Sequence, residues 1–313
     1  MSESSTTRRG VNALAVLGLA GLAYCVAEAH RYTLRRSTAA ALPDGQPPLR
    51  VLHLSDLHLT PRHRGRIAWV RSLEALDPDL VVVTGDFLAH RDAVPSALEA
   101  LEPLLARPGV FVLGSNDYYA PVLVPPWLYL KGPSDIEQDR PELPWGDLVT
   151  ALTGAGWHDL SNARAKLGIH GRLLDVRGVD DPHIGRDRYD HVAGPFDPDA
   201  DLALGVTHAP YLRVLDAMVD DGAGLVLAGH THGGQLRIPG YGALVTNCDL
   251  DTGRSRGLSR HARPWEGSGD PSFGGVDGRG AFLHVSAGLG TSPFAPVRFA
   301  CPPEATLLTL TSR

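Results

Sequence analysis

The chain has 313 residues, and 43% of them are hydrophobic, so it is long enough to bury one large core or two ordinary ones. Its 35 acidic and 29 basic residues give a net charge of -6, and no basic tract is interleaved with aromatic residues, which argues against a nucleic-acid groove. The three cysteines, Cys25, Cys248 and Cys301, are too few and too scattered for a disulfide framework or a Cys-x-x-Cys zinc site.

The first predicted element is an uncharged apolar stretch over residues 11–27, preceded by a pair of arginines. It lies at the short limit of a membrane-spanning helix, which needs roughly 17 to 25 residues. The arginine pair, together with the small residues Ala27 and Ala29, is also compatible with an export signal cleaved after Ala29. We therefore expect residues 1–36 to form a single-pass anchor in the cell membrane, with a cleaved signal and an exported protein as the alternative.

Residues 37–48 are rich in alanine and proline and predict a short linker to a body over residues 49–313. In that body strands and helices first alternate, which predicts an α/β fold with a parallel sheet. The expected order is strand 49–56, helix 66–76, strand 79–86, helix 93–106 and strand 109–117. Further strands are expected at 172–181, 201–210, 224–232, 235–239, 281–288 and 305–312. Two long loops are expected at 121–144, as a lid or membrane-contacting segment, and at 251–280.

Polar side chains that can bind a metal follow the apolar part of several of these strands. They are Asp56, His58, Asp86, Asn116, Asp117, His208, His230 and His232. Parallel strands bring their carboxyl ends to one edge of a sheet, so we expect these side chains to gather there. Carboxylates with imidazoles suit manganese, iron, zinc or cobalt better than calcium or magnesium. The set is too large for one ion, so it predicts two divalent ions, about 3.5 to 4 Å apart, that share Asp86 as a bridge.

A pair of divalent ions would lower the pKa of a bound water and offset negative charge on a phosphoryl group. The predicted substrate is therefore a phosphate ester. Each motif alone also has a structural interpretation: Asp56 can cap a helix, Asp86 can stand in a turn, and His208 can be a hydrogen-bonded histidine at a strand end. Their joint order favours the metal site. His53 and His284 lie inside predicted strands and are expected to pack in the core.

Taken in order, these motifs resemble the calcineurin-like metallophosphoesterases. They are Asp-x-His at 56–58, Gly-Asp at 85–86, Gly-Ser-Asn-Asp at 114–117, Thr-His-Ala-Pro at 207–210 and Gly-His-Thr-His at 229–232. The last two are more particularly similar to a membrane-associated bacterial branch that includes lipid-sugar pyrophosphate hydrolases. The resemblance implies a four-layer αββα sandwich with two metals at the sheet edges.

The resemblance also implies how the ligands divide between the two ions. One ion would be held by Asp56, His58, Asp86 and His232. The other would be held by Asp86, His208, His230 and an amide from the 114–117 loop.

The 114–117 loop departs from the family pattern of Gly-Asn-His followed by an acid. Ser115 falls at the metal-binding asparagine and Asn116 at the histidine that approaches the scissile phosphate. An amide oxygen is a better metal ligand than a serine hydroxyl, so we expect Asn116 to turn inward as the ligand and to act with Asp117 in catalysis. No histidine is then left at this position to protonate the leaving group. The chain should prefer activated esters or pyrophosphates, unless Asp117, His183 or a metal-bound water supplies the proton.

The sequence thus predicts a two-metal hydrolase of a phosphodiester or pyrophosphate bond, with a lipid-linked or envelope phosphate as the expected substrate class. Two alternatives stay open: an exported, soluble phosphatase acting on nucleotides, and a non-catalytic metal-bound scaffold. The sequence indicates no nucleic-acid partner and does not indicate an oligomeric state.

Overall fold

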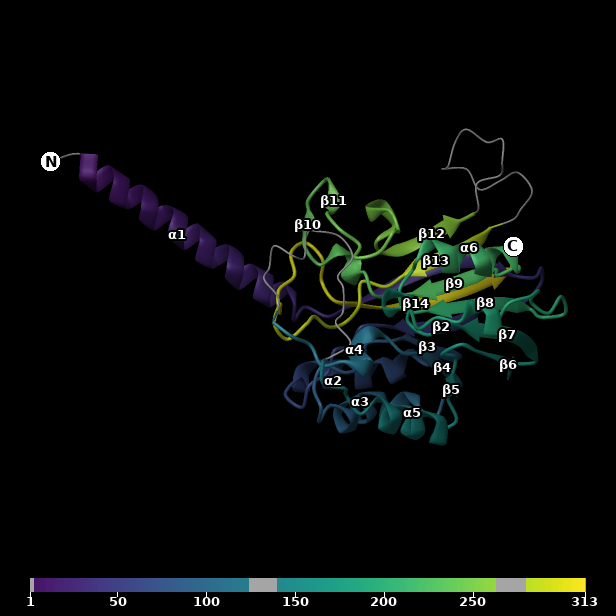
Figure 1. Ribbon diagram of the computed structural model, residues 1–313. Coiled ribbons are helices and arrows are strands. Elements are labelled where there is room, and N and C mark those ends of the chain that lie inside the picture. The colour runs from purple at the N-terminus through teal and green to yellow at the C-terminus, as the bar shows by residue number, and fades with distance from the viewer. Residues whose placement is uncertain (1–2, 124–139, 263–279, 313) are drawn as a thin grey trace.

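The computed structural model describes residues 3–123, 140–262 and 280–312 (Figure 1). Most of the predicted loop at 121–144, and the larger part of the one at 251–280, lie outside these residues. The described part of the second loop contains a strand that the sequence did not suggest, at Gly257–His261.

Two six-stranded sheets form the centre of the molecule. The first consists, in spatial order, of β1 (Thr33–Leu42), β14 (Glu304–Ser312), β2 (Leu49–Leu54), β3 (Leu80–Thr84), β4 (Gly109–Val112) and β5 (His158–Asp159). The second consists of β12 (Gly257–His261), β13 (Ala281–Val285), β9 (Leu225–Ala228), β8 (Leu202–Thr207), β7 (Arg172–Gly178) and β6 (Ala163–Ile169). A separate small hairpin pairs β10 (Arg237–Ile238) with β11 (Gly242–Ala243).

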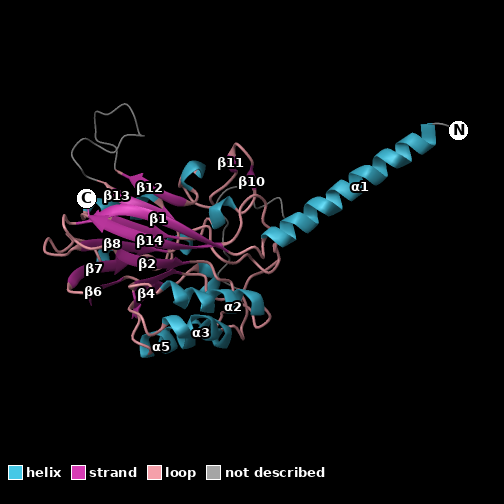
Figure 2. Ribbon diagram, turned by 180° about the vertical axis from the view of Figure 1, so that it is seen from behind, coloured by secondary structure: helices cyan, strands magenta, loops and turns pink. Residues whose placement is uncertain are grey.

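Helices cover the outer faces of both sheets (Figures 1 and 2). The described helices are α1 (Glu3–Glu28), α2 (Arg64–Arg71), α3 (Val94–Leu101), α4 (Ser115–Tyr118), α5 (Trp145–Gly154) and α6 (Leu212–Asp220). Helices α2, α3 and α5 pack on the first sheet and α6 packs on the second. The observed order β2, α2, β3, α3, β4 confirms the βαβαβ unit that the sequence predicted.

Alternation along the strands divides the core into layers. In β3, Val82 packs between the two sheets, whereas Val83 faces the helices on the other side. On the second sheet, Leu227 joins the layer between the sheets, whereas Val226 packs against α6. The molecule is therefore an αββα sandwich, as the resemblance implied. Strands β2, β3 and β4 run parallel, and so do β7, β8 and β9, so each set ends at one edge of its sheet.

Part of the predicted linker is a strand. Residues 37–42 belong to β1, which pairs in parallel with β14 from Thr33 onward. The alanines of this segment suggested a tether, but Ala39, Ala41 and Leu42 are buried in the layer between the sheets. Their burial corrects the boundary: the tether is confined to the residues between Leu42 and Leu49.

Helix α1 leaves the body of the protein and extends away from it in both views (Figures 1 and 2). Its end is attached to the body, because the backbone N–H of Arg298 donates to the carbonyl of Cys25 over 3.0 Å and the rings of Tyr24 and Phe299 meet edge to face. Of the helices that the structure describes, none combines the length and the apolar character that crossing a membrane requires. The predicted membrane-spanning segment is therefore not supported. Its uncharged part, over 11–27, is shorter than the roughly 20 residues that a typical span uses.

Candidate metal centre

The backbone turns sharply where β2, β3 and β9 end. Five residues that carry metal-capable side chains have positive φ there: Asp56 (51°), His58 (41°), Asp86 (56°), His230 (69°) and His232 (49°). A left-handed conformation costs a residue with a Cβ about 1 to 2 kcal/mol, and such residues concentrate at functional sites. We expected a strand over residues 224–232 that includes both His230 and His232. That expectation is wrong, because the β9 strand ends at Ala228 and both histidines have left the β conformation.

Four side chains form what we call the first group: Asp56, His58, Asp86 and His232. Each offers one ligand atom, and these atoms all lie within 4.8 Å of one another. His58 Nε2 is 3.2 Å from His232 Nε2 and 3.4 Å from Asp86 Oδ2. His232 Nε2 is 3.5 Å from Asp56 Oδ1. This is the set that the resemblance assigned to one ion.

The chemistry of the first group fits a divalent cation. Burial lowers the pKa of His58 to about 4 and that of His232 well below its ordinary value, so both rings are neutral near pH 7. The Nδ1 of His232 lies 3.1 Å from the carbonyl oxygen of Gly290, and the tautomer that donates to this oxygen carries its lone pair on Nε2. Two imidazole nitrogens that face each other and two carboxylates then surround a point where positive charge is stabilised.

The second group consists of Asp86, His208, His230 and Asn116. His208 is fully buried, and its Nδ1 donates to the carbonyl oxygen of Thr84 over 2.6 Å. Its Nε2 has no hydrogen-bond partner among the described residues and lies 3.6 Å from Asp86 Oδ2. Burial lowers the pKa of this ring, but the carboxylates of Asp86, Asp181 and Asp56 outweigh burial and raise it to about 10. An orphaned ring nitrogen in such a negative environment also fits a cation.

His230 joins the second group from the end of β9. Its Nε2 donates to the carbonyl oxygen of Asn247 over 3.0 Å, which leaves the lone pair on Nδ1. Its ring centroid lies 5.2 Å from that of His208 and 4.4 Å from that of His183. Its backbone N–H donates to both carboxylate oxygens of Asp56 and so ties the two groups together.

The 114–117 loop places Asn116 against Asp86. The backbone N–H and the side-chain amide of Asn116 donate to the two oxygens of Asp86, each over 2.8 Å. Asn116 thus lies beside the expected bridge, with its amide nitrogen facing it. A half-turn of the amide would present the oxygen, so the ligand role of Asn116 stays a prediction. Ser115 is buried beside it, 3.5 Å from the amide nitrogen.

Asp117 closes this loop from within. It is fully buried, and its carboxylate accepts backbone N–H bonds from Asp86, Leu88 and Gly114 over 2.8 to 3.0 Å. Burial and the nearby Asp86 carboxylate raise the pKa of Asp117 to about 8, against the effect of the Gly114 and Leu88 donors. Through these contacts Asp117 holds together the segments that carry the ligands. The contacts do not test its predicted catalytic role.

Two buried residues of the site, Asp181 and Arg298, were not among the predicted site residues. Asp181 is fully buried near His208 and Asp86, and burial raises its pKa to about 7. Arg298 is fully buried and donates to the carbonyl oxygens of Ala287, Gly288 and Gly290, and so holds the segment against which His232 rests. Arg298 comes from a stretch without regular structure, so no periodicity marks it. The Asp-Asp-Pro-His segment at 180–183 was the one available signal for Asp181.

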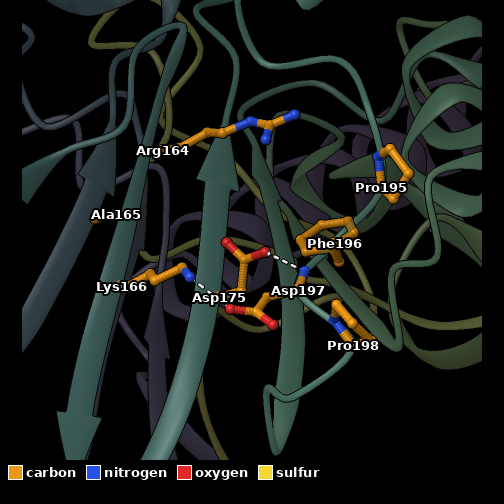
Figure 3. A pocket seen from close by; sticks show the side chains of 8 residues that line it. All are labelled: Arg164, Ala165, Lys166, Asp175, Pro195, Phe196, Asp197 and Pro198. Carbon is orange, nitrogen blue, oxygen red and sulfur yellow. Dashed lines mark hydrogen bonds and ion pairs between the residues drawn. The ribbon is translucent and has the colours of Figure 1, made fainter.

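A separate hollow of about 490 Å³ lies on strands β6 and β7, at the edge of the second sheet (Figure 3). Its charged side chains are paired with neighbours: Lys166 with Asp197, whose backbone N–H in turn donates to Asp175 over 2.8 Å. None of its lining residues belongs to either ligand group, so it is not part of the metal centre.

The comparisons with known proteins agree with this geometry. The model of the calcineurin-like phosphoesterase family (Metallophos) matches residues 49–234, which include both ligand groups. The chain is 27% identical to the uncharacterized protein YpbG of Bacillus subtilis (strain 168), over 85% of this chain and 82% of that protein. It is 24% identical to the uncharacterized metallophosphoesterase YkuE of the same organism, over 91% of this chain and 86% of that protein. It is also 29% identical to the transmembrane protein with metallophosphoesterase domain of Danio rerio, over 62% of this chain and 43% of that protein.

Proposed function

The chain belongs to the calcineurin-like phosphoesterase family and is a metal-dependent phosphoesterase, and from this premise we propose that it uses two divalent ions to hydrolyse a phosphodiester or pyrophosphate bond. One observation carries the proposal: Asp86 Oδ2 lies 3.4 Å from His58 Nε2 and 3.6 Å from His208 Nε2. A single carboxylate oxygen between two ligand groups is the arrangement that a bridging ligand requires. Manganese, iron, zinc and cobalt suit these ligands.

When bound, the two ions would supply an activated water and offset negative charge on the phosphoryl group. The chain's own contribution is to hold imidazoles and carboxylates in place before substrate arrives. His208 and His232 are each fixed through Nδ1 by a main-chain carbonyl, so their Nε2 atoms stay directed at the centre. Asn116, bonded to Asp86, would orient one phosphoryl oxygen or complete the second group.

The leaving group sets the expected preference. No histidine stands in the 114–117 loop, and Asp117 is enclosed by its own hydrogen bonds. His183, whose Nδ1 lies 3.1 Å from the hydroxyl of Tyr211, is the imidazole that stacks on the second group without belonging to it. Loss of a general acid costs about 10²- to 10⁴-fold for poor leaving groups and much less for good ones. Activated diesters and pyrophosphates are therefore the substrates that suit this centre.

A direct test compares bis(p-nitrophenyl) phosphate, p-nitrophenyl phosphate and a pyrophosphate diester on protein loaded with manganese, iron, zinc or cobalt. We expect the diester and the pyrophosphate to be hydrolysed faster than the monoester, and elemental analysis to find two ions per chain. Metal binding without hydrolysis of any of the three substrates would favour the non-catalytic scaffold instead. A preference for monoesters would favour the nucleotide phosphatase.

We further propose that the enzyme acts at a lipid surface on a lipid-linked phosphate. The support is α1, which carries apolar side chains that the body does not cover, with exposures of 64% at Val16, 68% at Leu17 and 68% at Leu19. Apolar side chains on an exposed helix favour contact with an acyl boundary. Flotation with vesicles tests this: Leu17→Asp with Leu19→Asp should leave the protein in the soluble fraction with its activity on bis(p-nitrophenyl) phosphate intact. Deleting residues 1–36 is a poorer test, because it would remove the first residues of β1.

A further inference from the structure

A pocket of about 490 Å³ lies where three segments leave the metal centre. Its lining residues come from the turn after His58, from the turn after Asp86 and from the segment after Gly290, together with the end of α1. The backbone N–H of His58 donates to the carbonyl of Asp86, and that of Gly290 to the carbonyl of Asp56, so these segments start side by side at the first group. A group bound in the pocket would therefore be next to a phosphate held at the centre.

The polar side chains of this pocket are cationic or neutral hydrogen-bond donors, and no carboxylate of the described residues lines it. They include Arg62, His63, Arg66, His90 and His30. One acid contacts a side chain of this set: the carboxylate of Asp92 lies 3.7 Å from Nδ1 of His90. Burial and then the charge of Arg66 lower the pKa of His63 to about 4. Arg62 and Arg66 thus bring positive charge to the pocket, which favours an anionic ligand.

The hydrogen bonds leave donors available at this pocket. The Nδ1 of His63 accepts the backbone N–H of Thr60, and the Nδ1 of His90 accepts that of Asp92, so in both rings Nε2 carries a proton. Arg66 is already engaged, because its Nη1 donates to the carbonyls of Leu57 and His58. The guanidinium of Arg62 has no hydrogen bond or ion pair with any residue that the structure describes.

We propose that this pocket binds a second anionic group of the substrate, a phosphate or a carboxylate, while the scissile phosphate lies at the metals. The proposal rests on the proposed function, since it assigns a part of the same substrate. Arg62 and His63 are the residues that would contact the anion. The proposal narrows the substrate class to compounds with two acidic groups separated by a short spacer.

A series of α,ω-alkane bisphosphonates with increasing numbers of methylene groups tests the proposal. Their binding to the metal-loaded full-length protein is measured by calorimetry, with alkyl monophosphonates for comparison. We expect one spacer length to bind at least about 10-fold more tightly than the monophosphonate, since a hydrogen bond to a charged group contributes about 1.5 to 3 kcal/mol. Arg62→Ala and His63→Ala should remove most of that gain, while Arg36→Ala, an exposed arginine on β1, should not.

The proposed anion site is refuted if bisphosphonates of every length bind equally well to the wild type and to Arg62→Ala. Failure of the proposed function gives a different result: bis(p-nitrophenyl) phosphate would not be hydrolysed, although the calorimetric difference between wild type and Arg62→Ala could persist.

A second and independent observation is a buried chain of hydrogen bonds beneath Asp56. It runs from His284 on β13 to His53 on β2, then to Thr84, Ser55 and the carboxylate of Asp56. The successive distances are 2.9, 2.9, 2.7 and 2.5 Å, and every member is at most 1% exposed. The chain crosses from the second sheet to the first and ends on a metal ligand.

Counting protons fixes the direction of this chain. An ionised Asp56 can only accept, so Ser55 donates to it, and the hydroxyl of Thr84 must then donate to Ser55. Thr84 has no second proton, so His53 donates to it through Nε2 and accepts through Nδ1. His284 therefore donates to His53 through its own Nδ1. Every bond of this chain points toward Asp56 Oδ2, while Oδ1 lies 3.5 Å from His232 Nε2 on the side of the first group.

A glycine preserves this chain by leaving space for it. A Cβ added at Gly229 would lie 1.8 Å from the Ser55 hydroxyl and 2.7 Å from Asp56 Oδ2. Gly229 does not have a positive φ, so space and not backbone conformation requires glycine here. The first glycine of Gly-His-Thr-His is thus required by the Ser55 side chain, which directly follows β2.

We infer that Ser55 and Thr84 are positioning residues, which orient Asp56 for the first ion through this directed chain. Ser55→Ala and Thr84→Val should weaken metal binding about 10- to 100-fold, the usual effect of removing a partner of a ligand. Thr84→Ser keeps the hydroxyl and should restore wild-type affinity. Calorimetric metal titration gives the affinity, and the melting temperature of the metal-free protein reports any structural loss separately. Equal affinities for Thr84→Val and Thr84→Ser, or unchanged metal binding in Ser55→Ala, would overturn the inference.

Discussion

In the first group all four ligand atoms already lie within 4.8 Å of one another, whereas in the second group Asn116 offers its amide nitrogen, and not its oxygen, to Asp86. The difference follows from where the ligands come from. The first group is built at the ends of β2, β3 and β9, and a buried hydrogen-bond chain holds Asp56. The second group depends on the 114–117 loop, where the sequence departs from the family pattern. We therefore expect the first group to bind its ion more tightly than the second.

The largest effect should come from Asp86, which belongs to both groups. Asp86→Ala should remove both ions and lower phosphodiesterase activity by at least about 10³-fold, because even one electrostatic donor contributes about 10²- to 10³-fold. Elemental analysis and turnover of bis(p-nitrophenyl) phosphate measure the two effects, with the exposed Asp190→Ala as control. One tightly held ion that survives in Asp86→Ala would show that the groups do not share a bridge.

The stability of the protein should depend on pH through His284, the first member of the hydrogen-bond chain that ends on Asp56 of the first group. Burial lowers the pKa of His284 to about 4, from 6.5 in the unfolded chain. As the pH falls, His284 is therefore protonated in the unfolded chain before it is protonated in the folded one. Its contribution to the free energy of unfolding is fully present above pH 6.5 and is lost as the pH falls toward 4. The shift corresponds to about 3 kcal/mol of unfolding free energy.

Denaturant unfolding of the metal-free protein at a series of pH values measures this decrease. His284→Gln cannot titrate and should flatten the slope between pH 6.5 and 4, whereas the exposed His170→Gln should leave it unchanged. An identical slope in His284→Gln and the wild type would contradict the assignment.

Single histidine variants should separate the two ions. His58→Ala should weaken the tighter ion and His208→Ala the weaker one, each by about 10- to 100-fold, a magnitude known even for partners of ligands. Calorimetric titration with manganese or zinc resolves the two steps in the wild type. If both variants lose the same step, the division into two groups is wrong.

The smallest effects should come from the loop. Asn116→Ala should weaken the second ion about 10-fold, because it removes the amide that contacts Asp86. Ser115→Ala should change metal content and turnover less than about 2-fold, within the range of a single weak hydrogen bond. The opposite ranking would place Ser115 at the metal and restore the ungapped alignment of the loop with the family pattern.

Much of the architecture could be read from the sequence because it depends on local patterns. The βαβαβ unit and β7, β8, β9, β13 and β14 were predicted from apolar runs. The strand β1 was missed because its alanines resemble a tether, and only pairing with β14 across the length of the chain makes it a strand. His53 and His284 were expected to pack in the core, and they do, but their contact joins two sheets and could not be foreseen from either strand.

The sequence by itself determined which residues can bind a metal, because carboxylates and imidazoles after apolar strands are visible as ordered motifs. It also determined the family, since the order of those motifs is specific. Only the tertiary structure decided which ligands meet and how they are held. Left-handed turns aim Asp56, Asp86 and His232 at one point, and Arg298 and Thr84, which carry no motif, fix that geometry through buried hydrogen bonds. Such contacts join residues far apart in the chain, so no local pattern encodes them.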